Sequence, residues 1–195
     1  VLVGRAAAKT TTDDGWSDYT IDDLKDCAPG TVGGIYYQAA TQGSYDVQIV
    51  PNFKPQTQWQ YYSLRAGQTH DYEHILTGGG FNYIGELLPY WFRLATIDQH
   101  IQNKELAGEM NVMGILGTTR YLLRTVLHYP ETWGAALKCI EQGIAIGRNS
   151  DPFWMAKMED YWHTPLDEAR RILGVRGAAD LDTEAEGQIW SGVKA

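Results

Sequence analysis

The sequence predicts an all-α fold, a single compact multi-helix domain, from three observations. Apolar residues recur at three- and four-residue spacing over long segments, which is the period of an amphipathic helix. Glycine and proline clusters that stop helices lie between these segments. The chain has 195 residues, enough for one domain with a sizeable core and too few for two typical domains.

The sequence of the first 19 residues predicts little regular structure. Residues 1–19 are rich in Thr, Asp, Gly and Ala without periodicity, so we expect a loose lead-in there. Two short helices are expected next, over 21–25 and over 31–41, on either side of a break at Pro29-Gly30.

Two helices joined by a glycine turn follow. The first is expected over 58–77 and is stopped by the three glycines 78–80. The second, over 82–97, is apolar nearly all round, which indicates burial. Pro89 lies inside this range and is expected to kink the helix.

The clearest helical pattern covers 105–128. Its apolar residues recur at helical spacing, and Gly114 and Gly117 lie on the other side, where they leave room for close approach by a helix or a ligand. Two further helices are expected over 132–146 and 153–173, the second capped by Ser150 or Asp151 and ended by Gly174. We therefore expect a helical domain over 20–176, followed by an acidic mobile tail over 177–195.

The composition excludes several classes of protein. With 24 acidic and 16 basic residues the net charge is −8, the wrong sign for binding a nucleic-acid backbone. No run of apolar residues approaches the length of a membrane span, so any membrane contact is expected to be peripheral. Cys27 and Cys139 have no disulfide-like spacing, which suggests a reducing compartment.

The segment around His70 carries the strongest chemical signal. His70 and His74 are four residues apart on one helix, so both imidazoles can reach one ion. A tight glycine turn would fold the next helix back antiparallel and bring Glu86 to them. Two imidazoles and a carboxylate suit catalytic zinc or non-haem Fe(II), and Asp71 could complete the coordination or orient a ligand.

An alternative is that His70 and His74 are ordinary partly buried histidines, because this spacing is common by chance. The metal interpretation is favoured because Glu86 lies amid apolar residues, where an unpaired carboxylate would be costly to bury. In zinc peptidases a Glu follows the first His, and the shorter Asp71 in that place argues against a peptidase.

These residues resemble the signature of a known family. His70-Asp71, His74 and Glu86 form His-Asp-x-x-His followed by eleven residues and Glu, which resembles the fourth Coq protein of coenzyme Q (ubiquinone) biosynthesis. The resemblance covers about residues 28–176. It includes, besides the signature, Pro29 to Gly33, Ile84-Gly85, Trp91-Phe92, Gly117 with Arg120, Glu159, Trp162, Leu166, Arg170 and Leu173 to Val175.

The resemblance implies a metal-dependent oxidative decarboxylase of a polyprenylated hydroxybenzoate-type acid, with the site between two antiparallel helices. It implies zinc, or Fe(II) or Mn(II), held by His70, Asp71, His74 and Glu86. The protein would lie peripherally on the inner membrane, on its cytoplasmic side or, in a eukaryote, its mitochondrial matrix side. Partners would be an isoprenoid lipid, proteins of a biosynthetic complex and a second copy in a homodimer, without nucleic acid.

Three further residues are candidates for catalysis. Asp71 or Glu73 could transfer a proton, and Arg120 could dock a carboxylate or phosphate through charge-assisted hydrogen bonds. Arg124 and His128 continue the cationic line and are expected to be solvated. Two alternatives stay open: a non-catalytic lipid-binding scaffold that organises a biosynthetic complex, and a zinc hydrolase with Asp71 or Glu73 as general base.

Overall fold

The computed structural model describes residues 19–42 and 55–190, and the regular structure within them is helical, as the sequence predicts. The predicted lead-in lies, except for Tyr19, outside the described residues. The helices are η1 (Ile21–Leu24), α2 (Val32–Gln42), α3 (Gln58–Thr77), α4 (Leu87–His100), α5 (Lys104–His128), η3 (Pro130–Thr132), α6 (Trp133–Asn149), η4 (Met158–Tyr161), α7 (Leu166–Ile172) and α8 (Glu184–Trp190).

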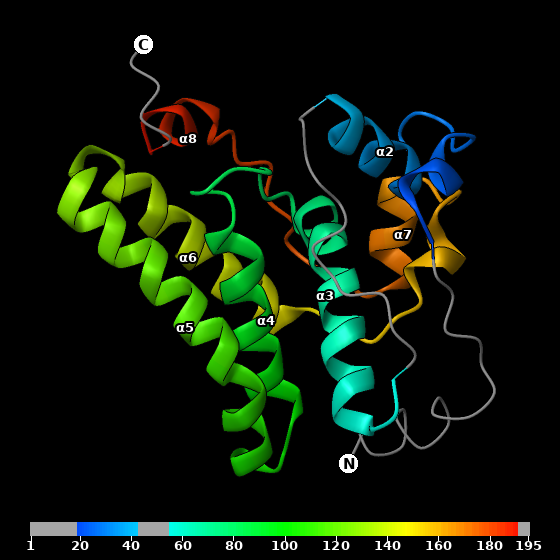
Figure 1. Cartoon of the computed structure of the whole chain (residues 1–195), viewed down its shortest axis with the longest axis horizontal. Helices are drawn as coiled ribbons and strands as arrows, with labels where there is room; N and C mark the ends of the chain where they lie inside the picture. The colour runs from blue at the N-terminus through cyan, green and yellow to red at the C-terminus, as the bar shows by residue number, and fades with distance from the viewer. Residues whose placement is uncertain (1–18, 43–54, 191–195) are drawn as a thin grey trace.

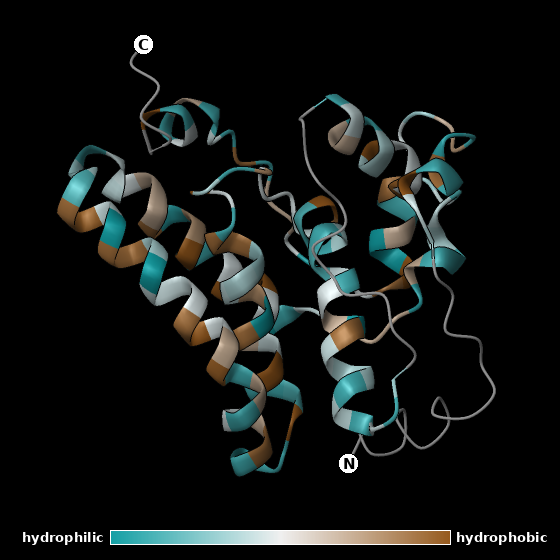
Figure 2. Ribbon diagram, in the orientation of Figure 1, coloured by the Kyte–Doolittle hydropathy of each residue, from teal (hydrophilic) through white to brown (hydrophobic). Residues whose placement is uncertain are grey.

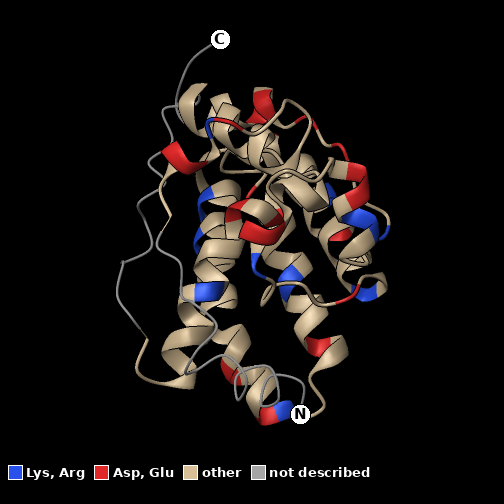
Figure 3. Ribbon diagram, turned by 90° about the vertical axis from the view of Figure 1, so that its right-hand side faces the viewer, with Lys and Arg blue, Asp and Glu red and all other residues tan. Residues whose placement is uncertain are grey.

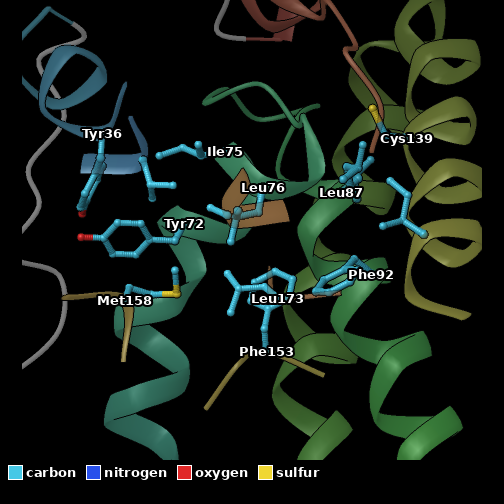
Figure 4. Packing of buried hydrophobic residues seen from close by; sticks show 14 of the residues in the cluster. Tyr36, Tyr72, Ile75, Leu76, Leu87, Phe92, Cys139, Phe153, Met158 and Leu173 are labelled. Atoms are coloured by element: carbon cyan, nitrogen blue, oxygen red, sulfur yellow. The ribbon is translucent and has the colours of Figure 1, made fainter. Parts of the chain in front are cut away.

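The long helices form two groups. Helices α4, α5 and α6 pack beside one another, while α2 and α7 lie on the far side of α3, so that α3 occupies the middle of the molecule (Figure 1). One core runs through both groups: Tyr72 and Leu76 of α3 are buried with Phe92 of α4, Cys139 of α6 and Leu173 after α7 (Figure 4). The two cysteines are free thiols.

Helix α3 has the predicted bounds, and local capping explains why. Thr57 accepts a hydrogen bond from the backbone of Gln60 at the start, and Gly78 ends the helix in the left-handed conformation (φ 84°). A Cβ at Gly78 would fall on the backbone carbonyl of Ala179, so no other residue fits there.

Helix α4 begins at Leu87 and not at residue 82, because the preceding residues form a turn. In that turn the Asn82 side chain accepts from the backbone of Gly85. Pro89 therefore lies in the first helical turn, where a missing N–H breaks no intrahelical bond, and the expected kink has no cause.

Glycines set the spacing between α4 and its neighbours. A Cβ at Gly143 of α6 would lie 2.5 Å from the carbonyl oxygen of Leu88, and one at Gly147 would lie 2.4 Å from that of Phe92. On the other side, a Cβ at Gly117 of α5 would lie 3.3 Å from the ring of Tyr90. The glycine side of α5 thus faces α4, which confirms the predicted close approach by a helix.

The apolar side of α5 has no partner among the described residues. Hydrophobic segments recur along this helix at the outer edge of the molecule (Figure 2). Seven of its large apolar residues are exposed, namely Val112, Met113, Ile115, Leu116, Leu123, Val126 and Leu127.

Two C-terminal segments differ from the sequence prediction. Residues 153–173 are not one helix: η4 and α7 are separated by an irregular stretch, and Pro165 ends it immediately before α7. Ser150 ends α6 and does not cap a later helix. The range predicted as a mobile tail contains α8, and Ala179 donates its N–H to Thr77 at 2.8 Å, because this segment packs on the end of α3.

Candidate metal centre

Helix α3 and the start of α4 bring two imidazoles and one carboxylate together, as the spacing predicts. His70 Nε2 lies 2.9 Å from Glu86 Oε2, and His74 Nε2 lies 3.5 Å from Glu86 Oε1. One ligand atom from each of the three residues lies within 4.8 Å of the others. Among the described residues, these three side chains form the group whose geometry could hold a metal ion.

His74 is fully buried and held from behind. Its Nδ1 lies 2.9 Å from the carbonyl oxygen of Gly80, and its ring stacks on Phe81 with 4.9 Å between centroids. Its Nε2 is buried without a hydrogen-bond partner among the described residues. A buried nitrogen in that state is costly in a protein interior unless something binds it.

The protonation states of the group are strongly coupled. Burial lowers the pKa of His70, but hydrogen bonds to Glu73 and Glu86 outweigh it and raise the pKa to about 9. Burial raises the pKa of Glu86, but the hydrogen bond with His70 and the close approach of the His74 imidazole outweigh it and hold that pKa far below its usual range. Without a metal ion, a proton therefore bridges His70 and Glu86 near neutral pH.

The donor set fits a divalent metal ion. Ligand atoms about 2.0–2.1 Å from a tetrahedral ion are roughly 3.4 Å apart, close to the two histidine–glutamate distances of 2.9 and 3.5 Å. The unpartnered His74 Nε2 is the atom that an ion would satisfy. Three protein ligands leave a coordination position for a substrate, as in catalytic sites.

The structure does not bring Asp71 to this group. Its carboxylate accepts a hydrogen bond of 2.6 Å from the hydroxyl of Tyr36, on the α2 side of α3. Asp71 therefore ties α2 to α3, and the predicted role as a ligand or proton carrier has no geometric support.

Glu73 and Arg120, the other catalytic candidates, have different surroundings. Glu73 is fully buried, 3.7 Å from His70 Nδ1, and is paired with Arg93. Arg120 is exposed, and its guanidinium carbon lies 5.9 Å from the centroid of the Tyr121 ring. Glu73 thus supports the group from behind His70, whereas Arg120 is not part of it.

An apolar pocket of about 340 Å³ adjoins the group, between α3, α4 and α5. His70 forms part of its wall, beside Tyr90, whose ring centroid is 5.2 Å from that of His70. Its other walls are mostly apolar and include Trp59, Tyr62, Pro89, Leu94, Ile97, Met110, Met113 and Leu116. The imidazole of His70 is therefore accessible from the apolar pocket.

Arg93 is the functional candidate that sequence reasoning missed. It lines the pocket, donates from Nε to Glu73 Oε1 (2.9 Å) and from Nη2 to the Ala66 carbonyl oxygen (2.8 Å). The signal was present as a single cation within the apolar run of α4. A charge in that setting indicates a buried pair, but the sequence did not name its partner.

Comparisons with known proteins bear on the fold and the family of this chain. The chain aligns over 90% of its length with the crystal structure of a candidate ubiquinone biosynthesis protein from Nostoc punctiforme, with a TM-score of 0.69, 19% identity and 78% of that chain covered. This likeness concerns the fold. No curated protein matches the sequence significantly. The family model for the coenzyme Q (ubiquinone) biosynthesis protein Coq4 matches residues 15–178, and the chain therefore belongs to the Coq4 family of ubiquinone biosynthesis proteins.

Proposed function

We propose that this protein is a metal-dependent decarboxylase that acts on a prenylated hydroxybenzoate-type acid in ubiquinone biosynthesis. One observation carries the proposal: a group of three potential ligands, His70, His74 and Glu86, adjoins an apolar pocket through the shared side chain of His70. Family membership supports the pathway. The ion we propose is zinc, with Fe(II) and Mn(II) as the alternatives.

The pocket suits a flat ring that bears a hydrocarbon chain. Its volume of about 340 Å³ is within the usual range for small-molecule sites. Tyr90 and Trp59 offer aromatic faces for the ring, and the aliphatic walls suit isoprene units.

Arg93 is the residue best placed to hold the substrate carboxylate. Its Nε and Nη2 are fixed by Glu73, Ala66 and Thr69, while no hydrogen bond from Nη1 is found within the described part of the chain. A pre-positioned guanidinium on a pocket wall binds a carboxylate at low entropic cost. Arg93 takes the role that the sequence suggested for Arg120.

The chemistry divides between the ion and the chain. A divalent ion held by His70, His74 and Glu86 would supply Lewis acidity to a phenolic or carboxylate oxygen of the substrate. As CO₂ leaves, the electron pair of the broken carbon–carbon bond stays on the ring. The oxidative form adds one oxygen atom from O₂ at that carbon, and two electrons from an external reductant convert the other atom to water.

Release of labelled CO₂ tests the proposal. Purified protein loaded with Zn²⁺, Fe(II) or Mn(II) is supplied with a farnesylated hydroxybenzoate that carries ¹⁴C in its carboxyl group, together with O₂ and a reductant. We expect release that is lost in His74→Ala and retained in Asp71→Asn. A metal-loaded protein that binds the lipid acid but releases no CO₂ would instead be a scaffold.

The scaffold alternative has one observation in its favour, the exposed apolar side of α5, which could also contact another protein of a biosynthetic complex. The hydrolase alternative is not favoured, because Glu73 is engaged by Arg93 and Asp71 by Tyr36.

Within the described ranges no helix combines the length and apolarity needed to cross a bilayer. We propose a peripheral position on the inner membrane, on its cytoplasmic or matrix side.

A further inference from the structure

The outer side of α5 is the largest run of exposed apolar side chains on any one described helix. Met113, Leu116 and Leu127 are 70%, 61% and 69% exposed, and four other large apolar residues of the helix are at least 45% exposed. Isolated exposed leucines are ordinary, but a set on one side of a helix over more than four turns marks an interaction surface.

The charges on this part of α5 are of one sign. From Met110 to His128 there is no Asp or Glu, whereas Arg120 and Arg124 are present and exposed. The whole chain has a net charge of −8, so an acid-free stretch of 19 residues stands out from its background. An apolar helix face flanked by arginines is typical of attachment to a membrane surface that contains anionic lipids.

The pocket opens toward this same surface. Met113 and Leu116 line the pocket and are also among the most exposed side chains of the helix. These two residues therefore belong both to the pocket wall and to the outer side of α5, and they mark the mouth of the pocket.

We infer that the outer side of α5 docks on a bilayer containing anionic lipids, with the pocket mouth facing the acyl chains. A lipid acid could then enter the pocket without passing through water; this last step rests on the proposed function, whereas docking itself does not. A second copy fits the charges less well, because two-fold self-pairing of this stretch would place arginines near arginines with no acid to compensate. Transfer of these apolar side chains from water to the acyl region of the bilayer is the driving force.

Vesicle sedimentation tests this inference without any substrate. The full chain is mixed with vesicles of phosphatidylcholine alone or with added phosphatidylglycerol. We expect strong binding only with phosphatidylglycerol, weakened by salt. The double variant Leu123→Asp/Leu127→Asp should bind about tenfold more weakly or less, and Arg124→Glu should lose most of the preference for phosphatidylglycerol.

Ile172→Asp is the matched control. Ile172 is 49% exposed on α7, on the far side of α3 from α5 (Figure 1), so the same change of chemistry there should leave vesicle binding intact. All four altered side chains are exposed, and unchanged thermal melting would show that the variants fold.

Three results would overturn the inference: wild-type protein that sediments with neither kind of vesicle, binding that survives the double aspartate variant, or a dimer in light scattering that the double variant converts to monomer. The last result would assign the surface to a second copy. CO₂ release is measured separately, so a failure of docking and a failure of the decarboxylase proposal are told apart.

Discussion

His74 donates a hydrogen bond from Nδ1 to the carbonyl oxygen of Gly80, at 2.9 Å. A carbonyl oxygen can only accept, so this contact assigns the proton of the neutral imidazole to Nδ1 and leaves the lone pair on Nε2, the atom that faces Glu86. Gly80 follows the left-handed Gly78 that ends α3. The turn that stops the helix therefore also orients a ligand of the candidate metal centre.

Metal content should depend on the three residues that the structure brings together. In His70→Ala, His74→Ala and Glu86→Gln, bound metal should fall from about one ion per chain to a small fraction, because each change removes one of three ligands. Asp71→Asn should keep its metal, since Asp71 accepts from Tyr36 and not from the site. Elemental analysis after dialysis measures this, and an equal loss of metal in Asp71→Asn would contradict the assignment.

Metal binding should release a proton at neutral pH. The pKa of His70 in the metal-free protein is about 9, so its imidazole is protonated at pH 7.5 and must lose that proton to bind an ion. Calorimetric titrations with Zn²⁺ in two buffers of different ionisation enthalpy should report about one proton released, and fewer above pH 9.

The raised pKa of His70 also predicts how the folding stability of the metal-free protein depends on pH. A pKa raised from 6.5 to about 9 means that protonated His70 stabilises the fold fully below pH 6.5 and that this contribution is lost as pH rises through 9. Melting temperatures of the chelator-treated protein should fall over that interval, and His70→Gln should flatten this dependence. A slope unchanged by His70→Gln would exclude His70 as its origin.

Removal of Arg93 should destabilise the protein because Glu73 is fully buried. Leaving a buried carboxylate without its partner costs about 3–5 kcal/mol, and urea unfolding of Arg93→Met should show a loss of this size. The double variant Glu73→Gln/Arg93→Met removes the uncompensated charge and should recover part of the loss. Failure of the double variant to recover any stability would assign the effect to lost packing.

Glycines in α6 offer a matched pair of changes. In Gly143→Ala the new Cβ would lie 2.5 Å from the Leu88 carbonyl oxygen and push α4 and α6 apart, at a cost of about 1–3 kcal/mol. Gly134→Ala meets nothing within 4 Å and should stabilise the same helix by about 0.5–1 kcal/mol. Thermal or urea unfolding compares the two, and equal effects would refute the packing described between α4 and α6.

The elements that could be predicted are those defined by local signals. The bounds of α3 follow from a capping threonine and a stop of three glycines, and the meeting of His70, His74 and Glu86 follows from helical spacing and a tight turn. The helical pattern of residues 153–173 predicts one helix, whereas the structure has η4 and α7 on either side of a break that ends at Pro165. Its ring excludes a helix interior, and this local signal should have divided the segment.

What could not be predicted depends on how helices meet. Periodicity identifies α5 as amphipathic but does not say which side is buried, and in the structure the side with Gly114 and Gly117 packs on α4. The pairing of Arg93 with Glu73 joins residues on two helices. Asp71 is adjacent to His70 in sequence, yet the helical rotation of about 100° per residue directs it toward Tyr36.

The contact between Ala179 and the end of α3 bears on how the protein can be shortened. The family match stops at residue 178, but the Ala179 N–H donates to Thr77 and the Leu181 N–H to Gly78, across the turn that carries Gly80. A version trimmed at the family boundary would lose both bonds and uncover the glycine hairpin from which His74 takes its orientation. The minimal recombinant unit that preserves the histidine pair therefore extends beyond the family match, at least through Leu181.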